Sequence, residues 1–288
     1  MASSLGILEI DGFKLRYTIE GVGQPALVIG SAIYYPRTFS HNLRNHLQLI
    51  FIDHRGFAPS TVTDTKKFEL DVLLDDIEAM RQHLNLKDFI VIGHSGHGYM
   101  ALEYAKKYPQ HVSHVVIIAT GPDQSEASHR AAAQYFEDTV SPEQKAFLEK
   151  DLQQLHVDIE SDPSHRFVHF CVRLGAKSWY DYTYNARKLW DGVTVNNAMF
   201  DYVWGTVFAN LDITKGLENF NKPVLLALGH FDFLVAPFFT WNPIRSKFKN
   251  LTIRLFGKSG HTPQLEEPEP FDAELLRWLS AHSHERNS

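Results

Sequence analysis

A serine in a short glycine-rich segment has the clearest capacity for covalent chemistry in this chain. Residues 89–98 read Phe-Ile-Val-Ile-Gly-His-Ser-Gly-His-Gly, and a run of helix formers follows at 99–108. A strand, a sharp turn and a helix, with the serine at the turn, lift a serine hydroxyl above the edge of a parallel sheet. We therefore expect Ser95 to be a nucleophile. The usual pattern is Gly-x-Ser-x-Gly, but His97 occupies the second glycine position.

A serine nucleophile needs a base to take its proton and an acid to orient that base, and both are present further along the chain. Asp232 follows an apolar run at 223–228, and His261 follows another at 251–256. The chain order Ser, Asp, His is the order found with a nucleophile turn of this kind. Because open parallel sheets build their sites at the carboxyl ends of the strands, we expect all three side chains at one edge.

Strands and helices that could carry these residues alternate along most of the chain. The predicted strands are 6–10, 13–20, 26–30, 47–53, the run that begins at residue 89, 114–119, 223–228 and 251–256. Apolar residues at helical spacing predict helices over 70–84 and about 270–281. This alternation predicts a mostly parallel eight-stranded α/β sheet with helices on both faces.

The alternation stops after residue 122 and resumes near residue 217. The segment between contains helical stretches and many aromatic residues, but no convincing central strand. We therefore expect a catalytic domain formed by 1–122 and 217–288, with a helical cap inserted at 123–216. Most of the aromatic side chains should form the core of the cap, and a minority should face Ser95 and make an apolar pocket.

Composition narrows the possible functions and locations. The chain has 288 residues, a formal net charge of -6 and one cysteine, Cys171. No stripe of Lys or Arg indicates nucleic-acid binding, and no apolar run reaches the ~20 residues of a membrane span. Sixteen histidines are present, yet no cluster has a recognisable metal-ligand spacing. We expect a cytoplasmic protein without a metal or other cofactor, whose partner is a small-molecule substrate; its oligomeric state is left open.

Four segments together resemble a known family. They are Asp53-His-Arg-Gly56 with Ser60, Gly93-His-Ser95, Gly229-x-x-Asp232, and Ser259-Gly-His-Thr-Pro-Gln-Leu-Glu-Glu-Pro268. The chain resembles the α/β-hydrolase fold superfamily, and in detail its proline-iminopeptidase-type branch. The resemblance implies that Ser95 is the nucleophile, His261 the general base and later acid, and Asp232 the residue that orients His261.

The tetrahedral intermediate of such a reaction needs hydrogen-bond donors for its oxyanion. One donor is expected to be the backbone N–H of Gly96, directly after the nucleophile. The other should come from the loop after residues 26–30. Most family members have a His-Gly pair there, whereas this chain reads Gly30-Ser-Ala-Ile33. Aligned on the end of the strand, Ala32 is the expected second donor.

These residues predict a cofactor-independent serine hydrolase that cleaves a small carboxylic ester, lactone or amide through an acyl-enzyme on Ser95. One alternative is a proline iminopeptidase, which needs cap carboxylates to hold a cationic amine; the candidates are Glu137, Asp138, Glu143 and Asp191. Another is a weakly catalytic ligand receptor of the same fold. Lyase and cofactor-free dioxygenase chemistries share the triad and stay open.

Two histidines, His94 and His97, lie close to Ser95 in the sequence. His97 is either tolerated because Gly96 and Gly98 relieve crowding, or it lines the pocket next to Ser95. His94 precedes the serine, and we expect it to point away from the chemistry.

Overall fold

The computed structural model describes residues 4–282, and within that range it contains one eight-stranded sheet. The strands are β1 Ser4–Ile10, β2 Phe13–Glu20, β3 Gln24–Gly30, β4 Leu47–Asp53, β5 Phe89–His94, β6 Val112–Ile118, β7 Val224–Gly229 and β8 Leu251–Phe256. Their order across the sheet is β1-β2-β4-β3-β5-β6-β7-β8. β2 pairs antiparallel with β1 and β4, and every other pairing is parallel. The predicted fold class is confirmed.

Successive residues of the central strands enter two different cores, which explains why these strands are apolar throughout. Leu27 and Ile29 of β3 pack in one core, whereas Ala26 and Val28 pack in the other. Side chains alternate between the two faces of a strand, so a strand covered on both faces needs apolar residues at every position.

Helices cover both faces of the sheet. The helices are α1 Leu70–His83, α2 His97–Lys107, α3 Glu126–Thr139, α4 Pro142–Ser161, α5 Arg166–Arg173, α6 Gly175–Ser178, α7 Asn197–Tyr202, α8 Pro263–Glu266 and α9 Pro268–His282. Residues of α1 and α2 belong to the core that contains Leu27, and residues of α9 belong to the core that contains Val28. The sheet is therefore enclosed between two helical layers.

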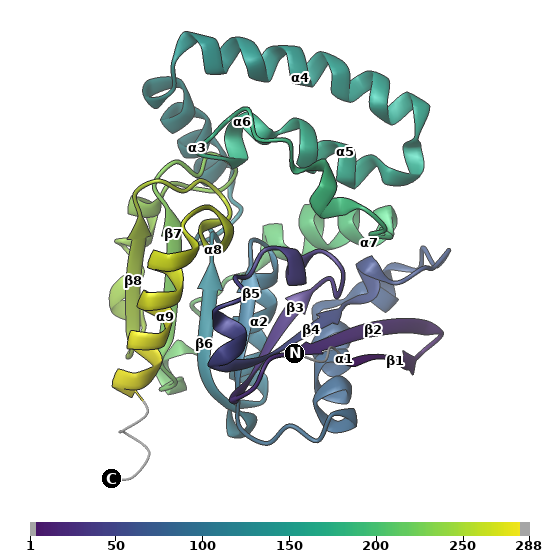
Figure 1. The fold of residues 1–288 in the computed structure, drawn as a ribbon, viewed down its shortest axis with the longest axis vertical. Helices are drawn as coiled ribbons and strands as arrows, with labels where there is room; N and C mark the ends of the chain where they lie inside the picture. Colours follow the sequence, from purple (N-terminus) through teal and green to yellow (C-terminus); the bar gives the residue numbers. More distant parts are fainter. Residues whose placement is uncertain (1–3, 283–288) are drawn as a thin grey trace.

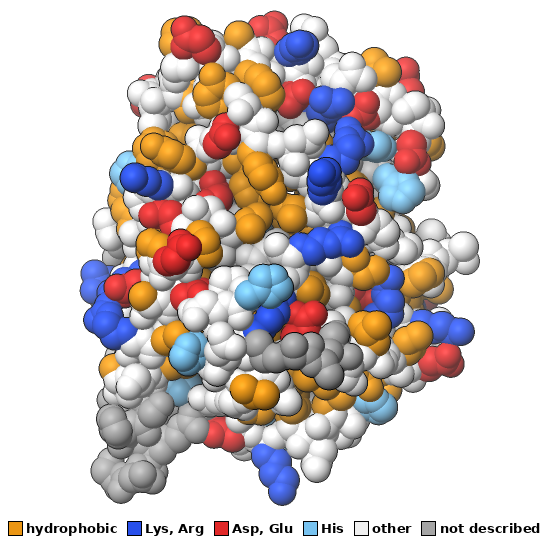
Figure 2. Space-filling model, in the orientation of Figure 1, with side chains coloured by type: hydrophobic (Ala, Val, Ile, Leu, Met, Phe, Trp, Pro, Cys, Tyr) orange, Lys and Arg blue, Asp and Glu red, His pale blue; other side chains and the backbone are white. Residues whose placement is uncertain are grey.

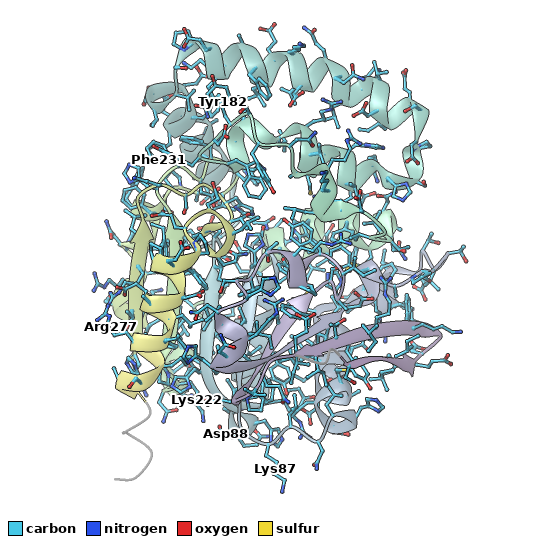
Figure 3. All side chains as sticks on the ribbon, viewed as in Figure 1. Lys87, Asp88, Tyr182, Lys222, Phe231 and Arg277 are labelled. Atoms are coloured by element: carbon cyan, nitrogen blue, oxygen red, sulfur yellow. The ribbon has the colours of Figure 1, made fainter. Side chains whose placement is uncertain are left out.

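The chain between β6 and β7 forms helices α3 to α7 and short helical turns. Figure 1 shows these helices above the upper edge of the sheet, where the parallel strands end. In Figure 3, Phe231 follows β7 at this edge, whereas Lys222 precedes β7 at the opposite end. The ring of Phe231 packs 5.1 Å from that of Tyr180, which follows α6. The predicted cap boundaries at residues 123 and 216 stay a prediction.

Hydrophobic and charged side chains are interspersed on the surface shown in Figure 2. In Figure 2, hydrophobic side chains lie among charged ones over the helices between β6 and β7. Leu152, Val157 and Phe170 are exposed apolar residues of this part. Within residues 4–282, no helix combines the length and the apolar composition that a membrane crossing requires.

Candidate active site

Ser95 lies in a strained turn between β5 and α2. Its φ is 57°, in the left-handed region that non-glycine residues rarely adopt. Two hydrogen bonds hold the turn: the Ser95 N–H donates to the Ile118 carbonyl at 2.8 Å, and the Thr120 hydroxyl donates to the Ser95 carbonyl at 2.7 Å. Such strain persists only where the surroundings over-determine it, and it concentrates at functional sites.

Glycine is required on either side of this turn, but not at position 97. A Cβ at Gly93 would lie 2.0 Å from the carbonyl oxygen of His97, and a Cβ at Gly98 would lie 2.2 Å from the Thr120 hydroxyl. His97 is the first residue of α2, and the preceding Gly96 has ordinary helical angles, φ -56° and ψ -25°. His97 is therefore accommodated without distortion of the turn, because the close approaches fall on its neighbours.

Asp232 and His261 form a hydrogen-bonded pair at the same edge of the sheet. His261 Nδ1 lies 2.8 Å from Asp232 Oδ2, and both residues are buried. The second carboxylate oxygen, Oδ1, accepts the N–H of Leu234 at 3.0 Å. A carboxylate at Nδ1 keeps the proton on that nitrogen and leaves Nε2 of a neutral ring as a base.

Ser95 and His261 line one cavity, so the structure brings the three predicted residues to one place. Among residues 4–282, no hydrogen bond joins the Ser95 hydroxyl to the His261 ring. Catalytic hydrogen bonds of this kind are often longer in a ligand-free enzyme and tighten when substrate is bound.

The loop that carries His261 is held by the carboxylate of Glu266. It accepts backbone N–H groups from Tyr180 at 2.7 Å, Gly260 at 3.0 Å and Thr262 at 3.0 Å. Burial raises the pKa of Glu266 above its ordinary value, although these three donors act in the opposite direction. Glu266 therefore ties the histidine loop to the segment after α6.

The two predicted oxyanion donors differ in their surroundings. Gly96 lies on the cavity wall, and in the described part of the chain its N–H has no hydrogen-bond acceptor. The N–H of Ala32 instead donates to Asp53 Oδ1 at 2.8 Å, and Ala32 is not part of the cavity wall among residues 4–282. The Ala32 N–H is thus not available to an oxyanion, because a buried carboxylate already uses it.

The next N–H groups of this loop are also engaged. Those of Ile33 and Tyr34 donate to the Ser31 hydroxyl at 3.2 Å and 3.1 Å. The hydroxyl of Ser31 therefore accepts the N–H groups of the two residues that follow Ala32.

The cavity beside Ser95 has a volume of about 560 Å³ and a mainly apolar wall that is rich in aromatic residues. Five aromatic residues from the chain between β6 and β7 line it: Phe167, Phe170, Trp179, Trp190 and Trp204. A concave, apolar site of this size fits a small organic molecule.

Few charged groups reach this cavity. In the described part of the chain, the Asp, Glu, Lys and Arg side chains of its wall are those of Asp123 and Lys177. His129 also lines it, in addition to the histidines near Ser95. The four carboxylates that the sequence offered for an amine, Glu137, Asp138, Glu143 and Asp191, lie outside the wall. Asp123 Oδ1 accepts the Ser125 N–H at 2.9 Å and the Ser128 hydroxyl at 2.6 Å.

The expectation for His94 is wrong. Its Nε2 lies 2.6 Å from the carbonyl oxygen of His261, and the two rings are 4.8 Å apart. His97 is buried and lines the cavity, as one of its two interpretations required. Sequence reasoning missed His54 and Tyr35, which contact His97. A signal existed for His54, because it directly follows β4 at the same edge as Ser95.

A family model, curated relatives and a solved structure all relate this chain to proteins with the α/β-hydrolase fold. The family model described as alpha/beta hydrolase fold matches residues 21–268. The AB hydrolase superfamily protein YclE of Bacillus subtilis is 46% identical over 275 residues, covering 95% of this chain and 98% of that protein. Proline iminopeptidase PfmaB of Pestalotiopsis fici is 27% identical over 250 residues, covering 80% and 83%. The crystal structure of proline iminopeptidase from Mycobacterium smegmatis superposes with a TM-score of 0.74 at 15% identity, covering 97% and 98%.

Proposed function

Because this chain belongs to the α/β-hydrolase fold family, we propose that it is a cofactor-independent serine hydrolase that cleaves a small carboxylic ester, lactone or amide. The observation that carries the proposal is the 2.8 Å contact between His261 and Asp232, with His261 and the strained Ser95 on the wall of one cavity. A nucleophile, a base and a group that orients the base are the parts that acyl transfer requires.

The proposed reaction has two halves. Ser95 Oγ attacks the substrate carbonyl carbon while His261 Nε2 takes the hydroxyl proton, and the Gly96 N–H donates to the developing oxyanion. His261 then gives the proton to the leaving alcohol or amine, which leaves an ester on Ser95. In the second half His261 takes a proton from water, and the resulting nucleophile attacks that ester. The bond to Ser95 Oγ then breaks as His261 gives the proton back to this oxygen, which releases the carboxylic acid and restores Ser95 and neutral His261.

The cavity wall favours an apolar acyl or leaving group. The aromatic residues offer large apolar surface, and burial of such surface contributes roughly 25 cal/mol per Å². An uncharged aryl or alkyl ester therefore suits this wall better than a cationic substrate.

Covalent labelling tests the proposal. A fluorophosphonate should modify the wild-type protein once, and peptide mass spectrometry should place the adduct on Ser95. Ser95→Ala should abolish labelling and aryl-ester turnover, and His261→Ala should lower both by about 10³-fold or more, because the base is lost. A folded wild-type protein that neither reacts with the probe nor hydrolyses any ester in a broad panel would refute the proposal.

Proline iminopeptidase activity is the second candidate, and one observation favours it beyond the relatives of that name. Asp123 lines the cavity, and its Oδ2 is not used by the serines that bind Oδ1. This oxygen is a possible acceptor for the cationic amine of an N-terminal proline.

Comparison of a proline arylamide with the matched aryl ester separates the two candidates. We expect the ester to have the higher kcat/KM, by about 10²-fold or more, and Asp123→Asn to change ester turnover by less than about twofold. Asp138→Asn, near the end of α3 and outside the cavity wall among residues 4–282, is the control. Faster arylamide cleavage that Asp123→Asn selectively weakens would instead establish the peptidase.

The ligand-receptor alternative rests on the loop after β3. Its N–H groups at Ala32, Ile33 and Tyr34 have intramolecular partners, so the oxyanion lacks a second donor from these positions. Loss of one such donor costs roughly 10²–10³-fold in kcat. Tight binding of a small ligand by a wild-type protein that the fluorophosphonate does not label would support the receptor.

A further inference from the structure

A line of buried hydrogen-bonding groups runs from the loop after β4 to the loop that carries His261, and it includes His94 and His97 on either side of the nucleophile turn. It begins at Gly56, whose N–H donates to His54 Nδ1 at 2.9 Å. His54 Nε2 lies 2.8 Å from Nε2 of His97. The first residue of α2 is thus joined by its ring to the loop after β4.

The line continues through a tyrosine. His97 Nδ1 lies 2.9 Å from the Tyr35 hydroxyl and 3.1 Å from the His94 carbonyl oxygen. The Tyr35 hydroxyl also lies 3.1 Å from His94 Nδ1. His94 Nε2 then reaches the carbonyl oxygen of His261 at 2.6 Å. Three histidines and one tyrosine therefore connect Gly56 to the backbone of the proposed general base.

The two ends fix the direction of every hydrogen bond between them. A backbone N–H only donates, so His54 Nδ1 accepts and the proton of a neutral His54 is on Nε2. His54 therefore donates to His97 Nε2, which places the His97 proton on Nδ1. At the other end a carbonyl only accepts, so His94 carries its proton on Nε2.

The proton positions derived for His97 and for His94 are both compatible with the hydroxyl of Tyr35. His97 Nδ1–H donates to the Tyr35 oxygen and the His94 carbonyl, and the Tyr35 hydroxyl donates to His94 Nδ1. Each donor has an acceptor, and each ring nitrogen is used. A fully satisfied buried network holds its members in one arrangement, whereas a buried member left unpaired is destabilising.

The groups are buried, and the rings are neutral at physiological pH. His54, His94, His97 and Tyr35 are exposed by 2%, 5%, 5% and 2%. Burial, with a smaller contribution from neighbouring rings, lowers the pKa of His94 to about 3, that of His97 to about 3, and that of His54 well below its usual range. A protonated ring would carry an N–H on both nitrogens, so the nitrogen that now accepts a hydrogen bond would instead face another donor. The hydrogen bonds of the network therefore require neutral rings.

The backbone of His261 is fixed on its other side as well. Its N–H donates to the carbonyl oxygen of Ser178, in α6, at 2.6 Å. The peptide groups on either side of the His261 Cα are therefore both bound, one by α6 and one by His94. Its ring is bound by Asp232. Movement of the ring towards or away from Ser95 would have to break one of these bonds.

We propose that His54, His97, Tyr35 and His94 form one directed hydrogen-bond network that positions the general base His261 relative to Ser95. They are positioning residues, since they act through the His261 backbone. The proposal rests on the proposed hydrolase function. It also assigns a role to the residue that departs from the Gly-x-Ser-x-Gly pattern, because a glycine at position 97 would leave His54 Nε2 and the Tyr35 hydroxyl without their shared partner.

Ring tautomers test the network without reference to activity. In ¹⁵N-labelled protein, long-range ¹H–¹⁵N spectra should show the proton on Nε2 of His54 and His94 and on Nδ1 of His97. The signals can be assigned by single replacements, and none should titrate between about pH 5.5 and 8. A His97 ring protonated on Nε2, or titration of any of the three rings in this range, would overturn the network.

Kinetics test the positioning role. Tyr35→Phe keeps the ring but removes the hydroxyl that links His97 to His94, and it should lower kcat and the fluorophosphonate labelling rate about 10-fold. KM should change by less than about twofold, because the interaction affects the transition state and not substrate binding. His97→Gly should have a similar or larger effect. His97→Asn, which can place a donor near the Nδ1 position, should recover part of the loss.

Tyr104→Phe is the matched control. Tyr104 is buried on α2 and donates to Glu78 at 2.8 Å, so this change also removes one buried tyrosine hydroxyl. It should lower the melting temperature without lowering kcat. Equal kcat for wild type, Tyr35→Phe and His97→Gly would refute the positioning role. If the wild type itself is not labelled, the hydrolase function and the positioning role both fail, while the tautomer spectra still decide the network.

Discussion

At the residue scale, the chemistry depends on which atom carries each proton. The Asp232 carboxylate keeps the His261 proton on Nδ1, and the same carboxylate is held by the Leu234 N–H. The side chain of Asp232 is 5% exposed, so water does not compete strongly for these contacts. Asp232 therefore determines which ring nitrogen of His261 carries the proton.

Asp232→Asn should test this dependence. The amide can keep the shape of the side chain, but its NH₂ group would face His261 Nδ1 and favour the tautomer that carries the proton on Nε2. We expect kcat to fall by about 10⁴-fold with little change in KM. Steady-state kinetics with an aryl ester measure the effect, and circular dichroism shows whether the variant is folded. A loss smaller than about 10-fold would contradict the role of Asp232.

The buried histidines should make stability depend on pH. An unfolded histidine takes up a proton near pH 6.5, but burial lowers the folded-state pKa of His94 to about 3 and that of His97 to about 3. Between these values the unfolded state binds more protons, so the free energy of unfolding falls as the pH falls through this window. Urea unfolding at several pH values measures the slope.

His97→Gln should reduce that pH dependence. Removing one such ring should shrink the difference in unfolding free energy between pH 7 and pH 5 by about 2 kcal/mol. The difference is taken within one variant, so a general loss of stability cancels. His156→Gln, at an exposed position of α4, is the control and should leave the difference nearly unchanged. Equal slopes for wild type and His97→Gln would show that this ring already takes up a proton in the folded state.

At the scale of elements, the site depends on the junction of β5 and α2. Gly93 is the last residue but one of β5, and it approaches the backbone of the first turn of α2. This approach lets the helix begin directly after the strand, so that Ser95 stands at the top of the turn. Glycine is needed there for space and not for a left-handed backbone.

Gly93→Ala should therefore destabilise the protein. The added Cβ would lie 2.0 Å from the His97 carbonyl oxygen, and backbone atoms would have to move. We expect the free energy of unfolding to fall by about 3 kcal/mol and ester turnover to be lost. Gly257→Ala is the control, since no atom lies within 4 Å of the added Cβ, and it should change stability by less than about 0.5 kcal/mol. Equal stability of the two variants would contradict the close approach.

At the scale of the whole molecule, the helices between β6 and β7 lie over the carboxyl edge of the sheet (Figure 1). The cavity is lined by residues from both of these parts. The sheet supplies Ser95 and His261, and the other part supplies aromatic walls such as Trp204. Trp204 also packs over the nucleophile turn, since a Cβ at Gly96 would lie 2.6 Å from its ring. In the proposed hydrolase, the reacting groups and the surface that selects the substrate therefore come from different parts of the chain.

Trp204→Ala should change substrate preference more than catalysis. Removing the indole enlarges the cavity and takes away apolar surface, so KM for a short acyl ester should rise about 10-fold while longer acyl chains gain in relative kcat/KM. Stability should fall by about 3 kcal/mol, as for other large-to-small changes at packed positions. A series of aryl esters of increasing acyl length measures the profile, with Leu152→Ala on exposed α4 as the control. An unchanged profile would place Trp204 outside the substrate path.

The sequence by itself determined the sheet and the places of Ser95, Asp232 and His261. Apolar runs such as 26–30 and 223–228 predict covered strands, and parallel strands bring their carboxyl ends to one edge. These inferences need only local patterns and a general rule of topology.

Only the tertiary structure decided what each polar group binds. It directed the Ala32 N–H to Asp53, turned His94 towards His261, and brought His54 and Tyr35 to His97. These partners come from loops that follow different strands, and a hydrogen bond depends on positions and angles that no local sequence pattern carries. The role of His97, which replaces the usual glycine near Ser95, therefore depends on His54 and Tyr35, which come from loops far away in the sequence.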